Sequence, residues 1–388
     1  MDYVRLGDLI TAAPIVKCGD GTYPVLSMTM HDGIMLQSDR FKKSLASINQ
    51  SNYKVVSNGQ LVIGFPIDEG VLYVQRVVDK GIMSPAYNVW DINTNLVIPE
   101  YLELALHSPF AMEYYKSKLR GTTARRRTLP TNELLALPVI LPNFDVQKKI
   151  IYACNKAASL IALRKEQLAK LDQLVKSRFI ELFGDPVSNP MGWDMPLIED
   201  VVTKEKNALK AGPFGSALKK EYYVSSGYKI YGQEQVISGD HTFGDYYIDE
   251  ERYQALQNCA VQAGDVLISL VGTYGKLLVM PEEFEPGIIN PRLMKITFDK
   301  KKVNPYYFQY YFQSDSLKKA LAENTHGGTM DILNLGIVRK LAMPVPPLEL
   351  QDAFITFVEQ TNKSKLSIQQ SLDKLELLKK SLMQEYFG

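Results

Sequence analysis

The sequence has few residues of the kinds that build metal centres or disulfide frameworks. Three cysteines and four histidines occur among its 388 residues. Cys18, Cys154 and Cys259 are far apart, which argues against a disulfide framework or paired zinc ligands and is typical of a reducing cytoplasm. No signal-peptide pattern opens the sequence, and no apolar run reaches the roughly 20 residues that a membrane-spanning helix needs. We therefore expect a cytoplasmic protein without a metal site.

Net charge is also nearly absent. The sequence has 44 Lys and Arg against 43 Asp and Glu, a formal charge of +1. A protein that bound nucleic acid through bulk charge would be more basic, so any such surface must be a local patch. Hydrophobic residues make up 46% of the chain, and this length is typical of two domains, each with its own core.

The main feature that is present is an internal repeat. Leu137–Gly184 aligns without a gap with Leu341–Gly388. Identical pairs include Pro142/Pro346, Gln147/Gln351, Leu171/Leu375 and Gly184/Gly388. Upstream, Gly59–Ile63 resembles Gly264–Ile268, and Gly81–Pro85 resembles Gly287–Pro291, in the same order. This pattern indicates a tandem duplication.

Each repeat begins with a β-rich stretch. Apolar runs bounded by glycine, such as Gln60–Phe65 and Val266–Val271, favour strands. An amphipathic helix is predicted at Glu100–Lys118 in the first repeat and at Pro305–Leu321 in the second. The aromatic run in the second helix, from Tyr306 to Phe312, favours core packing over a platform for base stacking.

Each repeat then closes with a long helix. Residues 144–183 and 348–387 contain no proline or glycine, and apolar residues recur at a mean spacing of 3.5, from Ile150 to Leu182 and from Phe354 to Tyr386. At 1.5 Å per residue, roughly 37 residues of such a helix are about 55 Å long, and a single helix cannot bury its apolar stripe alone. We expect them to pair, and a closed two-fold arrangement of the duplicated chain makes them antiparallel.

The sequence thus predicts an α+β protein. It has two similar α/β domains separated by two long helices, which form an antiparallel coiled coil with pseudo-two-fold symmetry. The expected boundaries are 1–143 for the first domain, 144–184 for the first helix, 185–347 for the second domain and 348–388 for the second helix.

In these features the chain resembles the specificity subunits of type I restriction-modification systems. The resemblance is carried by Leu137–Gln147 and Met343–Gln351, by the helix ends Glu181–Gly184 and Glu385–Gly388, by Gly212–Ser216, Gly264–Ile268 and Gly287–Leu293, and by the Gly-Thr pairs at 121–122 and 328–329. The segments cover essentially the whole chain, but the first domain has no clear equivalent of Gly212–Ser216.

The resemblance implies a DNA-binding subunit without a catalytic centre. Each domain would be a target recognition domain for one half of a split sequence in double-stranded DNA. The helices would set the gap and dock two modification subunits. No cofactor is expected on this chain. S-adenosylmethionine belongs to the modification subunits, and ATP with Mg²⁺ belongs to a restriction subunit where one takes part. The target sequence itself depends on loop geometry and DNA shape.

A basic cluster beside a Gly-Thr pair is the leading candidate for DNA contact. It contains Arg120, Thr122, Arg125, Arg126 and Arg127. Arginine can hold phosphates or read guanine edges with two hydrogen bonds, although a solvated loop has the same composition. The equivalent turn of the second domain carries His326 and Thr329.

Other candidates occur in glycine-rich or basic turns. They are Arg40, Lys42 and Lys43 in the first domain, and Lys219, Lys220, Gln233, Gln235, Thr273, Tyr274, Lys276 and Arg292 in the second. Lysine and arginine suit phosphate, and the glutamine amides suit base edges. An ordinary turn or surface strand explains many of these positions about as well.

Two alternatives remain open. The chain could be the specificity portion of a fused restriction-methylation enzyme, or a coiled-coil scaffold whose end domains bind protein or RNA. A catalytic reading has little support in these residues. Gly272–Leu277 lacks the spacing of a phosphate-binding loop, and Asn304–Tyr307 lacks the second proline of an adenine methyltransferase signature.

Overall fold

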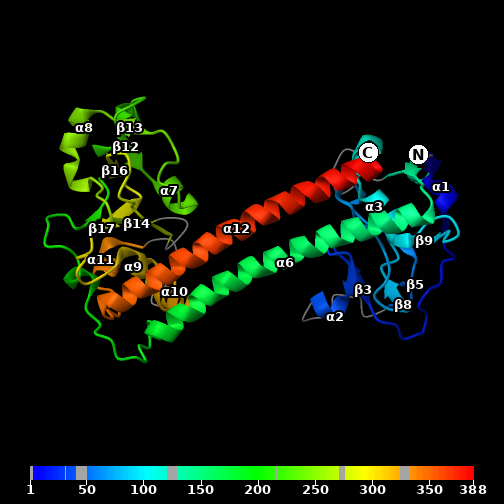
Figure 1. Cartoon of the computed structure of the whole chain (residues 1–388), viewed down its shortest axis with the longest axis horizontal. Coiled ribbons are helices and arrows are strands. Elements are labelled where there is room, and N and C mark those ends of the chain that lie inside the picture. The colour runs from blue at the N-terminus through cyan, green and yellow to red at the C-terminus, as the bar shows by residue number, and fades with distance from the viewer. Residues whose placement is uncertain are drawn as a thin grey trace. The chain divides into compact units, whose positions relative to one another are not determined.

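A computed structural model describes residues 3–30, 32–40, 50–119, 129–214, 217–270, 276–323 and 333–388 (Figure 1). The chain divides into two compact units, which are described separately. Unit 1 comprises Met1–Gln167 and Ile368–Gly388, and unit 2 comprises Leu168–Ser367. Both long helices pass from one unit to the other, so each unit combines one β-rich domain with parts of both helices.

Unit 1 is built on a four-stranded antiparallel sheet. Its strand order is β2-β9-β6-β7, with β2 at Ile10–Ala12, β9 at Asn88–Ile92, β6 at Leu61–Ile63 and β7 at Leu72–Val74. Three strand pairs surround it. They are β1 (Tyr3–Arg5) with β10 (Pro138–Ile140), β3 (Leu26–Met28) with β4 (Ile34–Leu36), and β5 (Lys54–Ser57) with β8 (Lys80–Met83).

The short helices of unit 1 connect and cover these strands. They are α1 (Leu6–Leu9), α2 (Gln37–Arg40), η1 (Ile67–Glu69), α3 (Pro99–Leu106), α4 (Pro109–Lys118) and α5 (Thr131–Leu135). The Ser108 hydroxyl caps α4 by accepting from the amide of Ala111, and Pro109 occupies its first turn. The expected single helix at Glu100–Lys118 is therefore wrong. A capping serine followed by proline starts a second helix there.

Unit 2 contains an equivalent four-stranded antiparallel sheet. Its order is β11-β17-β14-β15, with β11 at Leu209–Ala211, β17 at Leu293–Ile296, β14 at Val266–Ser269 and β15 at Leu277–Val279. A second sheet has the order β13-β12-β16, with β13 at Tyr247–Ile248, β12 at Tyr228–Tyr231 and β16 at Gly287–Ile289. In this sheet β12 and β16 run parallel.

The short helices of unit 2 are η3 (Ile198–Asp200), η5 (Lys220–Tyr222), α7 (Gln233–Ser238), α8 (Glu250–Ala255), η6 (Gln257–Cys259), α9 (Pro305–Phe312), α10 (Asp315–Glu323) and α11 (Leu335–Arg339). The predicted helix at Pro305–Leu321 is again two helices, α9 and α10. The break falls at Gln313 and Ser314, which correspond to His107 and Ser108 in unit 1.

The two predicted long helices are present as α6 (Phe144–Phe183) and α12 (Leu348–Phe387). Both end at a glycine. Gly184 adopts a left-handed conformation with φ of 75°, and its amide donates to the carbonyl of Ile180 at 2.8 Å. Gly388 does the same, with φ of 88° and a 3.0 Å bond to Gln384. Glycine adopts this left-handed conformation without steric cost, so it stops a helix cleanly.

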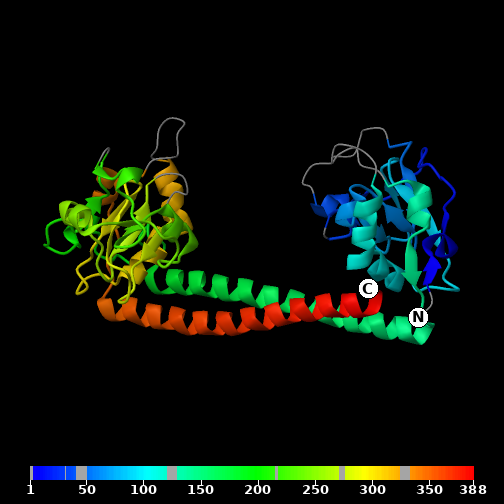
Figure 2. The ribbon, with the colours of Figure 1, turned by 90° about the horizontal axis from the view of Figure 1, so that it is seen from above.

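Segments of α6 and α12 pack antiparallel within each unit. In unit 1, the Lys165 ammonium lies 2.9 Å from a carboxylate oxygen of Glu376. In unit 2, Lys365 forms an ion pair with Asp172. The core of unit 1 also joins Ile150 from the start of α6 with Phe387 from the end of α12, so the two helix segments run antiparallel, as predicted. Figure 2 shows that, within each unit, the sheets lie to one side of the long-helix segments.

A buried glutamine joins each domain to its long helix in the same way. Gln147 accepts from the amide of Ile98 at 2.8 Å and donates to the carbonyls of Leu96 and Pro142. Gln351 accepts from the amide of Asn304 at 2.9 Å and donates to Lys302 and Pro346. We call each set of three bonds a glutamine clamp. The clamps are the clearest structural mark of the duplication.

Aromatic residues at the helix ends complete the core of each unit. Phe387 of α12 packs on Tyr101 of α3 with ring centroids 5.4 Å apart, and Phe183 of α6 packs on Tyr307 of α9 at 4.8 Å. The predicted seam placed Leu182 and Tyr386 innermost at these ends. The structure instead buries their neighbours Phe183 and Phe387, because the rings fit between the domain helices and the partner long helix.

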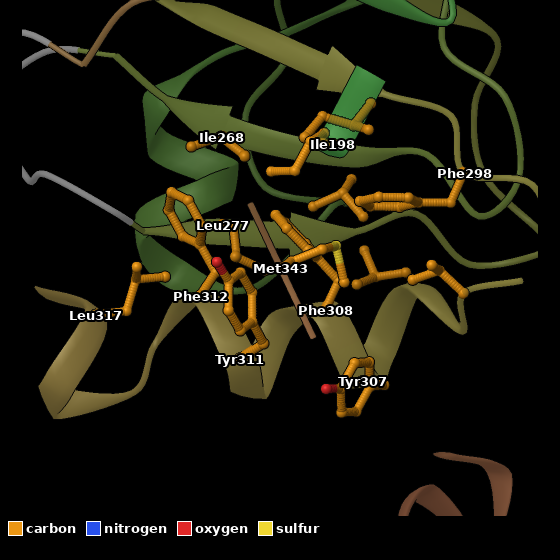
Figure 3. Close-up of a cluster of buried hydrophobic side chains, with 14 of the residues drawn as sticks. Ile198, Ile268, Leu277, Phe298, Tyr307, Phe308, Tyr311, Phe312, Leu317 and Met343 are labelled. Carbon is orange, nitrogen blue, oxygen red and sulfur yellow. The ribbon is translucent and has the colours of Figure 1, made fainter. Parts of the chain in front are cut away.

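Most of the aromatic run of α9 is core, as predicted, but Tyr306 is 42% exposed and Tyr310 is only partly buried. Tyr307, Phe308, Tyr311 and Phe312 are at most 1% exposed. Figure 3 shows Phe312 near Leu277 beneath the strands, whereas Tyr307 points away from the strands, toward the side where it packs on Phe183. The hydroxyl of Tyr307 donates to the carbonyl of Pro344 at 2.9 Å, which satisfies its buried polar atom. In the described ranges, no helix combines the length and apolar character needed to cross a bilayer.

Candidate nucleic-acid interface

The polar site of unit 2 lies where two neighbouring parallel strands end. Strand β12 ends at Tyr231 and β16 ends at Ile289, and these two residues are paired in the register. Gln233 follows the first strand after one glycine, and Arg292 follows the second in a short turn. The carboxyl ends of adjacent parallel strands form a common edge, which is a usual place for ligand contacts in open sheets.

The turn that carries Arg292 is held by several hydrogen bonds. The amide of Arg292 donates to the side chain of Asn290 at 2.9 Å, and its carbonyl accepts from the amide of Leu270 at 2.9 Å. The amide of Asn290 in turn donates to the carbonyl of Tyr231. Backbone atoms on both sides of the arginine are therefore fixed, while its side chain is exposed.

Gln233 and Arg292 contact each other directly. A terminal nitrogen of Arg292 donates to the side-chain oxygen of Gln233 at 3.4 Å. The amide nitrogen of Gln233 donates to the hydroxyl of Ser269 at 2.8 Å, and Ser269 is fully buried at the end of β14. The buried serine thus orients the glutamine, and the glutamine orients the arginine.

Gly232 allows this close approach. A side chain at this position would place its Cβ 2.8 Å from the side-chain nitrogen (Nδ2) of Asn290. Gln235 then supports the first turn of α7. It accepts from the amide of Gly232 at 2.8 Å, donates to the carbonyl of Phe243 at 2.6 Å, and is only 2% exposed. Its place in the predicted DNA-contact set has no support here, because burial and these bonds give it a structural role.

An open cavity of about 690 Å³ surrounds the pair. Its lining residues include two cations, one carboxylate and two tyrosines. They are Lys220, Tyr223, Ile230, Gly232, Gln233, Glu234, Gln235, Tyr246, Asn290, Pro291 and Arg292. The pKa of Tyr223 is raised, mainly by burial and further by Tyr246, so Tyr223 remains a neutral phenol. We call this set the β12–β16 cavity.

An ion pair between a buried lysine and a half-exposed glutamate supports strand β12. Lys229 of β12 is 1% exposed, and its ammonium lies 2.6 Å from Glu285 and 2.9 Å from the carbonyl of Thr242. The hydrogen bond from Lys229 is the main cause of the lowered pKa of Glu285. This lysine is engaged in the scaffold and does not line the β12–β16 cavity.

The remaining predicted residues are dispersed or lie outside the described ranges. Lys219 pairs with Glu221 at 3.4 Å, and Arg40 donates to the carbonyl of Met28 at 3.4 Å. Lys276 is exposed at the start of β15. Outside the described residues lie Lys42, Lys43, Arg120, Thr122, Arg125, Arg126, Arg127, Thr273, Tyr274, His326 and Thr329. The structure thus brings together Lys220, Gln233, Gln235 and Arg292 from the predicted set, and of these Gln235 is buried.

Sequence reasoning missed Asn290, Tyr223 and Tyr246 as parts of this cavity. For Asn290 a signal was available, because it stands in the repeated Gly-Ile-Ile-Asn-Pro segment at the end of a predicted strand. The two tyrosines carry no local signal. They reach the cavity only because β12 and β13 bring distant segments together.

Unit 1 has the same turn with a different side chain. Val25 forms a parallel bridge with Ile82 of β8, as Ile230 does with Ile288 in unit 2. After β8, the amide of Ala86 donates to the hydroxyl of Ser84 at 3.3 Å. Ser84, Pro85 and Ala86 thus take the places of Asn290, Pro291 and Arg292. A methyl group stands where unit 2 has a guanidinium.

Each unit also has a groove beside its long-helix segments. In unit 2 a cavity of about 570 Å³ is lined by residues of α6, α10 and α12, among them Asp172, Phe179 and Ile180. In unit 1 one of about 330 Å³ is lined by Lys165, Glu376 and Met383. By the sequence repeat, Asp172 corresponds to Glu376 and Phe179 to Met383. The two grooves therefore occupy equivalent places.

Potential metal ligands are not clustered in the part of the chain that the structure describes. Within these residues, no group of three or more His, Cys, Asp or Glu side chains could hold a metal ion. The cavity beside Arg292 contains a carboxylate, three amides and two tyrosines, but none of the residues that line it is a histidine, cysteine or serine nucleophile. Its chemistry is that of hydrogen-bonded recognition.

Comparison with known proteins agrees with this picture. Residues 190–378 match a family model described as "Type I restriction modification DNA specificity domain". The MjaVIII specificity subunit of Methanocaldococcus jannaschii is 20% identical over 98% of this chain and 91% of its own length. The HindI specificity subunit of Haemophilus influenzae is 25% identical over 29% of this chain and 25% of its own.

Solved structures show the same fold. A chain from work on complex assembly and conformational transition of the type I R-M system superposes with a TM-score of 0.64 at 17% identity, covering 100% of this chain and 97% of that one. The S subunit from M. genitalium gives 0.51 at 12% identity, with 100% and 96% covered. The resemblance predicted from the sequence is confirmed.

Proposed function

Because this chain shares its fold and its sequence features with the specificity subunits of type I restriction-modification systems, we propose that it is the DNA-specificity subunit of such a complex. Each β-rich domain reads one part of a bipartite target in double-stranded DNA. The long helices connect the domains and set the unread gap. Specificity subunits are in general non-catalytic, and methyl transfer and cleavage belong to the other subunits of the complex.

The observation that carries this proposal is the duplication, which is visible in matching hydrogen bonds of the two units. The glutamine clamps at Gln147 and Gln351 join each domain to a long helix through the same three hydrogen bonds. The lining of the β12–β16 cavity differs from the equivalent turn in unit 1. Two equivalent frames with different reading surfaces suit a target made of two different half-sites, and linking two weak readers raises their joint affinity.

The two equivalent grooves suit two copies of one partner, and we assign them to modification subunits. Asp172 and Lys176 in unit 2 correspond to Glu376 and Lys380 in unit 1, so each groove offers a carboxylate and an ammonium at matching places. A partner that uses the same surface on both units would recognise this repeated charge pattern. S-adenosylmethionine would be bound by those partners and not by this chain.

Methylation-aware sequencing of host DNA tests the proposal. Cells that carry the chain with its modification partner should show a methylated motif of two short defined parts separated by a gap of fixed length. Deletion of this chain alone should abolish that motif. Methylation that persists without the chain would contradict the proposal, and so would methyl transfer by the purified chain without a partner.

A further inference from the structure

We propose that Arg292 is a specificity-determining residue that reads a guanine in the half-site of the second domain, with Gln233 as its positioning residue. This inference rests on the proposed function and adds to it the base read by one of the two domains. It comes from the geometry of the β12–β16 cavity.

The first argument is the way the arginine is presented. Its backbone is fixed by Asn290 and Leu270, and its exposed guanidinium contacts Gln233 at 3.4 Å. Arginine has five N–H donors in a planar fork, and within the described residues this contact uses one of them. The remaining donors can form the paired hydrogen bonds to O6 and N7 by which arginine recognises guanine in the major groove.

The second argument is that a buried residue holds Gln233, and through it Arg292, in a defined orientation. Ser269 is fully buried and accepts a 2.8 Å hydrogen bond from Gln233, so the glutamine oxygen is directed toward Arg292. The single charge of a lysine is enough to hold a phosphate. A base edge requires both donors in one plane. The Ser269–Gln233–Arg292 series provides that orientation.

The third argument concerns charge. Glu234 lines the same cavity as Arg292. Its carboxylate repels a phosphate, whereas it can accept a hydrogen bond from the N4 amine of a cytosine. A guanine–cytosine pair thus satisfies both charged groups, and a phosphate satisfies only one. Lys220 also lines the cavity, and its ammonium suits the phosphates of the DNA backbone.

The fourth argument is the contrast with unit 1. The equivalent turn there carries Ala86, with the same backbone bond to its Ser84 partner. A methyl group cannot donate a hydrogen bond, so the first domain has no guanine reader at this position. The inference therefore applies to one half of the target and predicts that the two halves respond differently to one substitution.

The test is to map the methylated motif in cells that express variants of the full chain with its modification partner. In Arg292→Ala, one guanine position of one half-site should become degenerate, with a roughly 5- to 150-fold loss of discrimination against other bases there. Arg292→Lys keeps the charge but loses the planar fork, so it should relax the same position. Gln233→Ala should relax that position as well, to a smaller extent.

Arg339→Ala serves as the matched control. Arg339 lies on α11 of the same unit, is partly exposed and pairs with Glu199 at 3.5 Å, so its removal changes the charge equally without altering the cavity. It should leave the motif unchanged. An unaltered motif in Arg292→Ala overturns the inference, and so does a uniform loss of methylation with all base preferences retained. Absence of any bipartite motif in the wild type would instead refute the proposed function.

Discussion

The two units share the frame that joins a domain to a long helix, and they differ on the surfaces and in the polar contacts around the sheet. The glutamine clamps match bond for bond, and Tyr101 and Tyr307 donate to carbonyls at equivalent places, those of Ile140 and Pro344. By contrast, Ala86 stands opposite Arg292. A duplicated chain can thus keep its assembly geometry while each copy recognises a different ligand.

A second difference lies beside the four-stranded sheets. In both units a turn places a side chain that accepts from a backbone amide three residues earlier, Gln60 from Ser57 and Asp265 from Gln262. In unit 1, Gln60 then donates to Asp91 at 2.7 Å. In unit 2, Asp265 binds Thr297 and forms a 3.0 Å ion pair with Lys295. The same position is neutral in one copy and charged in the other.

The largest expected effect comes from breaking this charged contact. Asp265 is 0% exposed and Lys295 is 4% exposed, so Asp265→Ala leaves a buried ammonium without its counter-ion. We expect a loss of about 3–5 kcal/mol in the stability of unit 2. Gln60→Ala should cost unit 1 only about 1–2 kcal/mol, because its contacts are partly exposed. Hydrogen exchange of the amides in β14 and β6 measures the two units separately.

Adding Lys295→Met to Asp265→Ala provides the control. Methionine removes the buried charge and keeps an unbranched side chain of similar length, so part of the lost stability should return. Equal losses of stability in Asp265→Ala and Gln60→Ala would show that the buried charge does not distinguish the two units.

The next expected effect concerns the clamps and should be the same in both units. Gln147→Ala and Gln351→Ala each remove three hydrogen bonds of a fully buried side chain and leave backbone groups unsatisfied. We expect each substitution to lower the free energy of unfolding of its unit by about 2–3 kcal/mol. Faster exchange of the Ile98 amide in the first variant, and of Asn304 in the second, would report the loss directly. A large cost in one unit alone would contradict the equivalence of the clamps.

A smaller effect should distinguish the two grooves. Ile180 is 46% exposed in the groove of unit 2, and its repeat counterpart is the exposed Gln384. Ile180→Glu places a charge on an apolar contact and should weaken binding of one modification subunit by roughly tenfold, about 1.4 kcal/mol. Native mass spectrometry would then show a complex with one such partner in place of two.

The matched control is Gln384→Glu, which adds the same charge at the equivalent place on a polar side chain. It should leave both partners bound. Loss of both partners from the Ile180 variant would contradict the assignment of separate, equivalent docking grooves.

The duplication, the two long helices and the aromatic core could be predicted from the sequence, because each produces a regular local pattern. Contacts between distant segments could not be predicted in this way. The amides of Gln233 and Gln235 look alike in sequence, and both line the cavity. Gln235 is 2% exposed and bonded to Gly232 and Phe243, whereas Gln233 contacts Ser269 and Arg292 from distant segments. The break between α3 and α4 does have a local signal, because Ser108 followed by proline is typical of a helix start. The apolar periodicity, which continues across this point, predicted a single helix instead.

The central claim is that two equivalent domains read two different half-sites, and a chimaera tests it most directly. The first domain, residues 1–143, would be replaced by the second, with its junctions at the two glutamine clamps, and the methylated motif would be mapped in cells with the modification partner. We predict a target with the second domain's half-site in both places. A motif that keeps the original first half-site would contradict the account.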